Sequence, residues 1–344
     1  MIRKPLFWIV PFALLSVASL GAAPPDPATS GPKATKSEQA PNPALYSAER
    51  ARARRATVAR SRAATLAREM AEPLPRYKVD ASGDLVPDLR AAAAIIYDPD
   101  TKQVLWEENS QSQRSIASIT KLMTATVFLE SNPDLAQPVT VARSDVFRAS
   151  TTRLRANYHV TADDLLHLLL IASDNAAARA LARISPYGSE GFVGRMNEKA
   201  AELGLESTHY AEPSGLLSEN VSSAYDMARL ITQVSSDERI GPIMRTPEYT
   251  VYNSNRPITF RSTNYLLGRT NVDVLAGKTG FISKAGYCLA TLLRLPQSGQ
   301  QVAVVVLGAR SNASRFMETQ NLLTWLSNKT STIFATTTTQ QQQQ

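Results

Sequence analysis

Ser118 and Lys121 are spaced so that the lysine could activate the serine. The sequence Ser118-Ile119-Thr120-Lys121 opens an apolar run that continues to Leu129. Residues three apart share one face of a helix, so Lys121 can reach the Ser118 hydroxyl from the next turn. A serine needs a base to become a nucleophile, and a lysine can be that base only if its pKa falls from about 10.4 toward 7–8. That fall costs roughly 4 kcal/mol, which burial, a helix N-terminus or a second cation could supply.

The position expected for Ser118 is the N-terminus of this helix. Free backbone N–H groups and the positive end of the helix dipole would stabilise an oxyanion there. The pair alone also fits a helix-capping serine beside a surface lysine, because this spacing is expected about once by chance in a chain of this length.

A second polar segment, Ser173-Asp174-Asn175, lies between two apolar runs that read as helices. A short break between helices can project a hydroxyl and an amide into a cleft. Taken alone, the segment also fits an ordinary helix N-cap.

A third segment, Gly277-Lys278-Thr279-Gly280, follows the strand-like run 271–276. On a strand edge it would place a cation, a hydroxyl and open backbone beside a ligand. Gly280 would leave room for a substrate strand to pair alongside. The spacing of its glycines is not that of a phosphate-binding loop, and an ordinary turn is the alternative interpretation.

The ordered set Ser-x-x-Lys, Ser-Asp-Asn and Lys-Thr-Gly is far more specific than any of its members. With it the sequence resembles the low-molecular-mass penicillin-binding proteins, which are D-alanyl-D-alanine carboxypeptidases and endopeptidases. The resemblance runs from about Ala91 to Lys329 and includes the segments 115–124, 212–216, 263–264 and 277–287. Within that family the chain looks most like the short, anchorless endopeptidase branch.

The resemblance implies that Ser118, Lys121 and Ser173 are catalytic and that Lys278 and Phe281 belong to the substrate-binding residues around them. Ser118 would form the acyl-enzyme, and Lys121 would take its proton. Ser173 would relay a proton to the leaving amine. Lys278 would raise the local positive potential and lower the pKa of Lys121. The backbone N–H groups of Ser118 and Phe281 would form the oxyanion hole.

The resemblance also implies which groups hold the substrate. Asn175 would bind the substrate amide, and Thr279 would bind the terminal carboxylate or its equivalent. Arg315 is a further candidate for a substrate carboxylate, with Arg310 as an alternative. The expected partners are peptidoglycan stem peptides and β-lactam inhibitors, and no metal or organic cofactor is implied.

Several functions on this fold have to be distinguished. The anchored carboxypeptidase branch is expected to carry a further β-rich domain and an amphipathic C-terminal helix. This chain ends in Thr/Gln repeats instead, which favours the endopeptidase. A class A-like β-lactamase is a second alternative, but no Glu-x-x-Leu-Asn lies between Ser173 and Lys278. Its absence predicts slow release of a penicilloyl group and inhibition by penicillin. A wall-binding module without turnover is disfavoured by the intact Ser118, Lys121 and Ser173.

The elements that must position these residues indicate an α+β fold, and the resemblance implies an antiparallel β-sheet covered by helices plus a helical subdomain, as in β-lactamases and transpeptidases. Hydrophobic residues make up 43% of the chain and charged residues 19%, as in globular proteins. Two extended runs, 91–97 and 103–107, predict a hairpin. Later strands are expected at 287–295 and 301–308. Helices are expected at 119–131, 162–171, 174–183, 189–203, 224–236 and 314–327.

The ends of the chain are expected to lie outside this domain, which we place at 85–330. Residues 1–23 read as a signal peptide, with an uncleaved anchor as the alternative, so the protein is expected in the periplasm without integral membrane association after cleavage. Residues 24–84 read as a disordered, basic linker, and 331–344 as a low-complexity tail. Seven arginines between residues 50 and 68 could bind anionic wall polymer or simply be solvated. Nucleic acid is not an expected partner.

The remaining reactive side chains are predicted to be structural. Cys288, the single cysteine, lies in an apolar run, which predicts a buried thiol and rules out a disulfide within the chain. The mechanism needs none of the three histidines.

Overall fold

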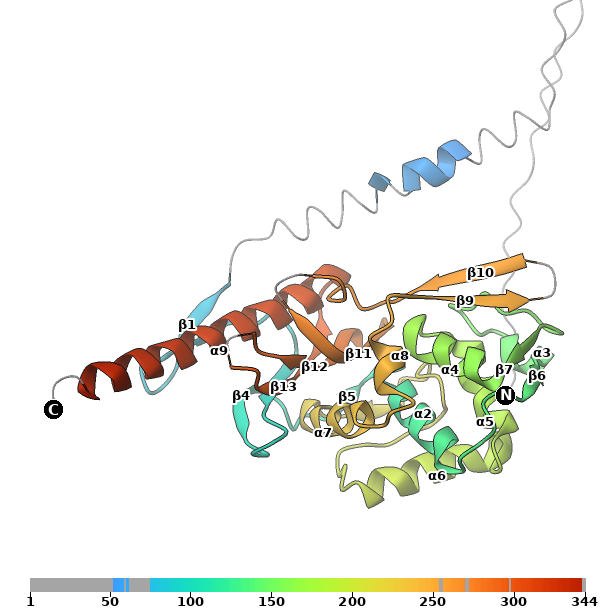
Figure 1. The fold of residues 1–344 in the computed structure, drawn as a ribbon, viewed down its shortest axis with the longest axis horizontal. Helices are drawn as coiled ribbons and strands as arrows, with labels where there is room; N and C mark the ends of the chain where they lie inside the picture. The colour runs from blue at the N-terminus through green and yellow to red at the C-terminus, as the bar shows by residue number, and fades with distance from the viewer. Residues whose placement is uncertain are drawn as a thin grey trace, which may run out of the picture. The chain divides into compact units, whose positions relative to one another are not determined.

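The computed structural model describes residues 52–58, 60–61, 75–253, 256–269, 272–296 and 298–341. Its centre is a five-stranded antiparallel sheet with the strand order β11-β12-β13-β3-β4 (Figure 1). The strands are β3 (Ala93–Tyr97), β4 (Val104–Glu108), β11 (Asp273–Ile282), β12 (Gly286–Arg294) and β13 (Gln301–Ala309). Pairing of β13 with β3 joins the first hairpin of the domain to the last strands of the chain. The predicted α+β class and the predicted hairpin are confirmed.

Both faces of the sheet are covered by helices, which explains why β13 is apolar at almost every position. Val304 and its same-face neighbours pack against Phe316, Leu322 and Trp325 of α9 (Asn312–Gln341). On the other face, Val305 belongs to the core that includes Met227 of α7 (Ala224–Ser235). The alternation of side chains along each strand thus divides the core into two layers.

A helical subdomain adjoins the sheet and is packed around the apolar α4 (Ala162–Ile171). Its other helices are α2 (Lys121–Glu130), α3 (Arg143–Val146), α5 (Asn175–Ile184), α6 (Gly188–Glu202) and α8 (Gly241–Met244). The long helices of this subdomain, α2, α4, α5 and α6, were each predicted within two residues of their bounds. Asp174 caps α5 by accepting a hydrogen bond from the Ala177 N–H, and Thr161 caps α4 in the same way.

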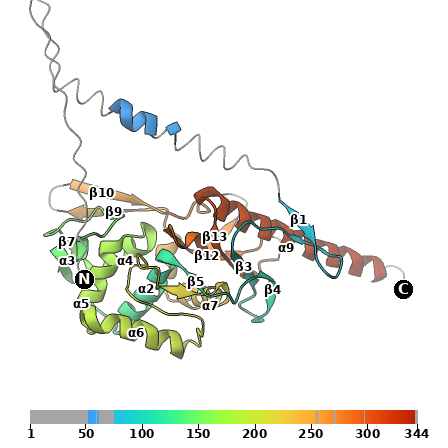
Figure 2. The same cartoon turned by 180° about the vertical axis from the view of Figure 1, so that it is seen from behind.

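Four short antiparallel pairs complete the described chain. They are β1 (Tyr77–Val79) with β2 (Leu85–Pro87), β5 (Arg114–Ser115) with β8 (Val221–Ser222), β6 (Pro138–Thr140) with β7 (His159–Thr161), and β9 (Glu248–Asn253) with β10 (Arg256–Arg261). Figures 1 and 2 show β9 and β10 lying over α4.

The ordered part of the chain differs from the expected bounds at both ends. Strand β1 lies before Leu85, where the linker was expected to continue, and it pairs with β2, whose Leu85 carbonyl accepts a hydrogen bond from Trp325 Nε1. Helix α9 continues to Gln341, through much of the tail for which no regular structure was expected. Glutamine is a good helix former, so a helix nucleated by packing can extend into such a tail.

The segments 52–58 and 60–61 are helical with exposed side chains, which fits both interpretations of the basic stretch. The proposed signal peptide lies outside the described residues. Within the residues that the structure describes, no helix combines the length and the apolar character that crossing a membrane requires.

Candidate active site

Ser118 lies in a tight turn at the junction of the sheet and the helical subdomain. The turn is the 3₁₀ helix η1 (Ala117–Thr120), which leads directly into α2. Ala117 has a φ of 48°, a left-handed conformation that is strained for a residue with a side chain. A Cβ at Gly215 would lie 2.1 Å from the Ala117 carbonyl oxygen, and one at Gly280 would lie 3.1 Å from the Ser118 nitrogen. Two glycines from distant segments therefore allow the backbone to close around the serine.

This packing corrects the part expected for Gly280. The glycine was expected to leave room for a substrate strand, but its missing side chain leaves room for the turn that carries Ser118. The expected helix N-terminus at Ser118 is likewise a 3₁₀ turn, because the left-handed residue before it tightens the chain.

Lys121 is the first residue of α2, and its side chain is fully buried. Its Nζ lies 2.9 Å from Ser118 Oγ and 2.7 Å from Asn175 Oδ1, and it also contacts the Ser214 carbonyl oxygen. Burial lowers the pKa of Lys121 to about 7, against the opposing charge of Glu212. A neutral amine has two N–H donors and one lone pair. The two carbonyl acceptors match the donors, which leaves the lone pair for the Ser118 hydroxyl proton.

Glu212 fixes the loop that presents the Ser214 carbonyl oxygen to this lysine. Its carboxylate accepts hydrogen bonds from the Ser214 N–H at 2.7 Å, the Leu216 N–H at 2.7 Å and Asn220 Nδ2 at 2.8 Å. The sequence had marked 212–216 only as part of the resemblance, without a role. A glutamate followed by Pro-Ser-Gly was the available signal, because such a segment turns sharply and needs an acceptor for its amides.

Lys278 on β11 is also buried, and it holds Ser173. Its Nζ donates to Ser173 Oγ at 2.7 Å and to the Thr279 carbonyl oxygen at 2.9 Å. Ser173 is itself left-handed, with a φ of 59°, and Ser118 directly follows the left-handed Ala117. Burial, and then the charges of Lys121 and Arg315, lower the pKa of Lys278 well below its usual range. The ordered hydroxyl of Ser173 can accept a proton from one neighbour and pass one to another.

The sequence named burial, a helix N-terminus and a second cation, Lys278 by the resemblance, as causes of a lowered Lys121 pKa. Burial is the main cause at Lys121, and besides burial the charge of Lys121 in turn lowers the pKa of Lys278. The pKa of Lys121 is lowered, as a lysine that acts as a base requires.

Asn175 and Thr279 are buried beside these groups. The Asn175 carbonyl oxygen accepts from Lys121, and its amide donates to the Ser150 carbonyl oxygen. Both ends of this side chain are thus bonded within the protein, and its expected grip on a substrate amide stays a prediction. The Thr279 hydroxyl lies 2.6 Å from that of Thr263. Binding of a carboxylate by Thr279 also stays a prediction.

Arg315 lies against β11 and β12, and its expected contact with a substrate carboxylate stays a prediction. It is 6% exposed, and its Nη1 donates to the carbonyl oxygens of Gly280 at 3.0 Å and Cys288 at 3.2 Å. Its Nη2 donates to Asn312 Oδ1, and the guanidinium lies 4.9 Å from the centre of the Phe316 ring. Burial lowers its pKa to about 10. Its two Nη atoms thus tie α9 to β11 and β12, while its buried Nε has no hydrogen-bond partner among the described residues.

Phe281 follows Gly280 on β11. Its ring is half-exposed and stacks on that of Tyr287, with 4.2 Å between the ring centres. Since Gly280 abuts the Ser118 nitrogen, the backbone of Phe281 begins beside the expected oxyanion hole. Arg310, the alternative carboxylate contact, is exposed. Cys288 is buried, as predicted, and burial raises the pKa of its thiol to about 11.

Known proteins of one kind match this chain. Residues 80–311 match the sequence model of the family described as D-alanyl-D-alanine carboxypeptidase. A D-alanyl-D-alanine endopeptidase of Escherichia coli (strain K12) is 34% identical over 244 residues, which cover 70% of this chain and 78% of that protein. One of Pseudomonas aeruginosa is 36% identical over 243 residues, with the same coverage.

A more distant enzyme and a solved structure agree with these matches. The D-alanyl-D-alanine carboxypeptidase DacF of Bacillus subtilis (strain 168) is 31% identical over 68% of this chain and 61% of its own length. The crystal structure of the Streptomyces K15 DD-transpeptidase superposes with a TM-score of 0.64 at 27% identity, over 70% of this chain and 97% of that one.

Proposed function

Because this chain belongs to the D-alanyl-D-alanine carboxypeptidase family of serine peptidases, we propose that it cleaves D-Ala peptide bonds of peptidoglycan through an acyl-enzyme on Ser118. The observation that carries the proposal is the contact of 2.9 Å between Ser118 Oγ and the buried Lys121 Nζ. With its pKa near 7, Lys121 is neutral often enough to act as a base at neutral pH. The chain is therefore a serine-type D-alanyl-D-alanine endopeptidase or carboxypeptidase.

Acylation begins with transfer of the Ser118 hydroxyl proton to Lys121. The serine oxygen attacks the D-Ala carbonyl carbon, and the carbonyl oxygen becomes the oxyanion that backbone N–H groups stabilise. The C–N bond then breaks, and the departing amine takes a proton through Ser173. The proton that Lys121 took from Ser118 replaces the one given to the amine, so Lys121 is neutral again in the acyl-enzyme. Lys278 holds the Ser173 hydroxyl in place for that transfer.

Hydrolysis of the acyl-enzyme reverses these steps with water as the nucleophile. Lys121 takes a proton from the water, which attacks the ester carbonyl. Ser118 leaves with a proton, and the D-Ala carboxylate is released. No Glu-x-x-Leu-Asn lies between Ser173 and Lys278, so we propose that a penicilloyl group leaves slowly and that penicillin inhibits the enzyme rather than serving as a substrate.

We favour the D-Ala–meso-diaminopimelate crosslink as the bond that is cleaved. The relatives named endopeptidases match over 78% of their length at 34% and 36% identity, against 61% of the length at 31% for the carboxypeptidase DacF. Both reactions attack the same carbonyl group, so the preference has to come from contacts to the leaving group. A carboxypeptidase acting on terminal D-Ala is the alternative.

The test is a competition between a crosslinked muropeptide dimer and a free pentapeptide. We expect a higher kcat/KM for the dimer, and no cleavage of either by Ser118→Ala. A higher kcat/KM for the pentapeptide would make this protein a carboxypeptidase. Labelled penicillin should attach to the wild type alone, and labelling that survives in Ser118→Ala would contradict the assignment of the nucleophile.

We further propose that the protein is exported to the periplasm with cleavage after Ala23. The apolar run Leu6–Leu20 after Arg3 and Lys4 supports this proposal. N-terminal sequencing of the mature protein should begin at Pro24. Recovery only in the membrane fraction, with residues 1–23 intact, would refute cleavage.

A further inference from the structure

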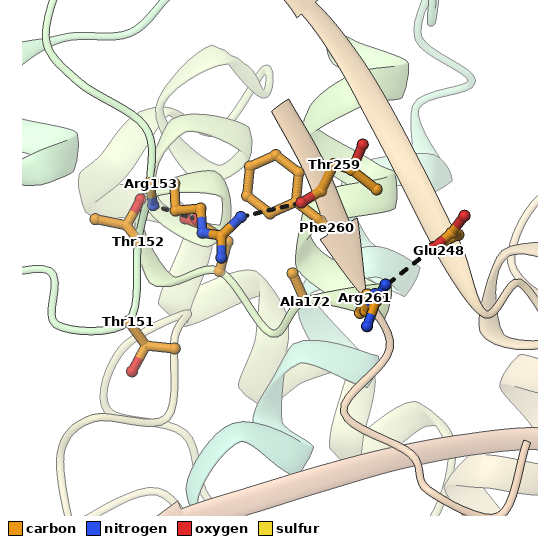
Figure 3. Close-up of a pocket in the computed structure, with 9 residues that line it drawn as sticks. Thr151, Thr152, Arg153, Ala172, Glu248, Thr259, Phe260 and Arg261 are labelled. Atoms are coloured by element: carbon orange, nitrogen blue, oxygen red, sulfur yellow. Dashed lines mark hydrogen bonds and ion pairs between the residues drawn. The ribbon is translucent and has the colours of Figure 1, made fainter. Parts of the chain in front are cut away.

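An open pocket of about 870 Å³ adjoins the catalytic residues (Figure 3). Ligand pockets in proteins usually measure about 300–1,000 Å³. This one is therefore far larger than a single alanine requires. It is lined by Thr151, Thr152, Arg153, Ala172, Asp174, Glu248, Thr259, Phe260 and Arg261.

Two walls of the pocket are tied to the catalytic residues. Ala172 and Asp174, which flank Ser173 in the chain, both line it. The loop that contains Arg153 begins at Ser150, whose carbonyl oxygen accepts a hydrogen bond from Asn175. The pocket thus starts next to the serine that is proposed to protonate the leaving amine.

The third wall, formed by β10, is also connected to the catalytic residues. Strand β10 contributes Thr259 and Arg261, and two residues later the Thr263 hydroxyl contacts that of Thr279. In the proposed mechanism, Ser118 attacks the carbonyl carbon and Ser173 protonates the departing amine. A pocket that starts next to Ser173 is then on the leaving-group side of the scissile bond.

Besides the carboxylates of Asp174 and Glu248, this pocket offers two arginines to a peptide that carries carboxylates. The Arg153 guanidinium donates to the Thr259 carbonyl oxygen at 3.0 Å and lies 5.6 Å from the centre of the Phe260 ring. Within the described part of the chain it forms no ion pair with a carboxylate. Its planar fork is suited to binding a carboxylate with two hydrogen bonds.

Arg261 offers a second, weaker cation. Its side chain is 85% exposed, and its Nε lies 3.7 Å from Glu248 Oε2, in a pair that is itself largely exposed. Such surface pairs contribute little stability, so a ligand carboxylate can compete for the arginine.

We propose that this pocket binds the leaving strand of a crosslink, with Arg153 as the main contact to its carboxylates and Arg261 as a second one. The inference rests on the proposed function, because only an endopeptidase releases a whole stem peptide. The carboxylate next to the departing amine is common to both kinds of leaving group. The rest of the leaving stem carries further carboxylates that free D-alanine does not have.

The experiment compares Arg153→Gln and Arg261→Gln with the matched control Arg155→Gln. Arg155 is an exposed arginine two residues away that does not line the pocket. For each variant we would measure kcat/KM for the crosslinked dimer and for the pentapeptide. We expect Arg153→Gln to lower the value for the dimer about ten-fold, as loss of one charged hydrogen bond does, and the value for the pentapeptide by less than about three-fold. Arg261→Gln should have a smaller effect in the same sense, and Arg155→Gln should change neither value.

The outcomes separate this inference from the function on which it rests. A wild-type enzyme that prefers the pentapeptide overturns the endopeptidase proposal itself. A wild-type enzyme that prefers the dimer, with equal losses on both substrates or none in Arg153→Gln, overturns the pocket alone. Thermal unfolding and penicillin acylation report whether Arg153→Gln is folded. Should it not be, Arg261→Gln decides, since the largely exposed Arg261 contributes little to folding.

Discussion

Acylation of Ser118 should follow the protonation of Lys121. The amine must be neutral to accept the hydroxyl proton, and burial places its pKa at about 7 instead of 10.5. At pH 7 about half of the Lys121 side chains are then neutral, against about 1 in 3,000 for an ordinary lysine. The difference corresponds to roughly 5 kcal/mol, which the fold supplies by keeping the side chain out of water.

The sign of the pH dependence follows from this protonation. As the pH falls below the pKa, the neutral fraction drops to about 10% at pH 6 and about 1% at pH 5. We therefore expect the second-order rate constant for penicillin acylation to rise ten-fold per pH unit below about pH 6 and to level off above about pH 8.

The assay is stopped-flow acylation by a fluorescent penicillin from pH 5 to 9, with circular dichroism to show that the protein stays folded. Lys121→Arg should abolish acylation at every pH, because a guanidinium does not deprotonate in this range. A rate constant that is independent of pH, or one whose midpoint lies near pH 10, would refute the role of Lys121 as the base.

Three further substitutions test the surroundings of this lysine. Glu212→Gln should shift the midpoint of the acylation profile below pH 7, because the Glu212 charge raises the Lys121 pKa; an unchanged midpoint would contradict that coupling. Lys278→Arg keeps a cation on β11 and should retain part of the acylation rate, whereas a loss equal to that of Lys121→Arg would argue against separate roles. Gly280→Ala should reduce penicillin acylation at least 100-fold, because its Cβ would lie 2.7 Å from a backbone oxygen of the turn that carries the nucleophile. Gly194→Ala, in a helix with open space around it, is its control and should leave acylation unchanged.

The sequence predicted the members of the site because their chemistry depends on residue type and order. Ser118, Lys121, Ser173 and Lys278 meet as the three motifs imply. The apolar periodicity likewise predicted the long helices and the late strands, since burial of one face leaves a regular pattern. These features are encoded locally.

Features that depend on long-range packing escaped prediction. The left-handed Ala117 is set by glycines at 215 and 280, about 100 and 160 residues further along the chain, so nothing near the serine reveals it. The hydrogen bonds from Arg315 to carbonyl oxygens of β11 and β12 also join distant segments, and nothing near Arg315 in the sequence reveals them. The hairpin β9–β10 and the pocket beside it went unpredicted for the same reason.

The two buried lysines divide the work of the site through their unequal surroundings. Lys121 donates to two carbonyl oxygens, and it has the carboxylates of Glu212 and Asp174 within range of their charge. Lys278 donates to a hydroxyl and a single carbonyl oxygen, and other cations dominate its surroundings. Besides burial, the charge of a protonated Lys121 lowers the pKa of Lys278. Proton transfer from Ser118 to Lys121 therefore also weakens the hold of Lys278 on its own proton. That coupling favours passing a proton through Ser173 at the moment when the leaving amine needs one.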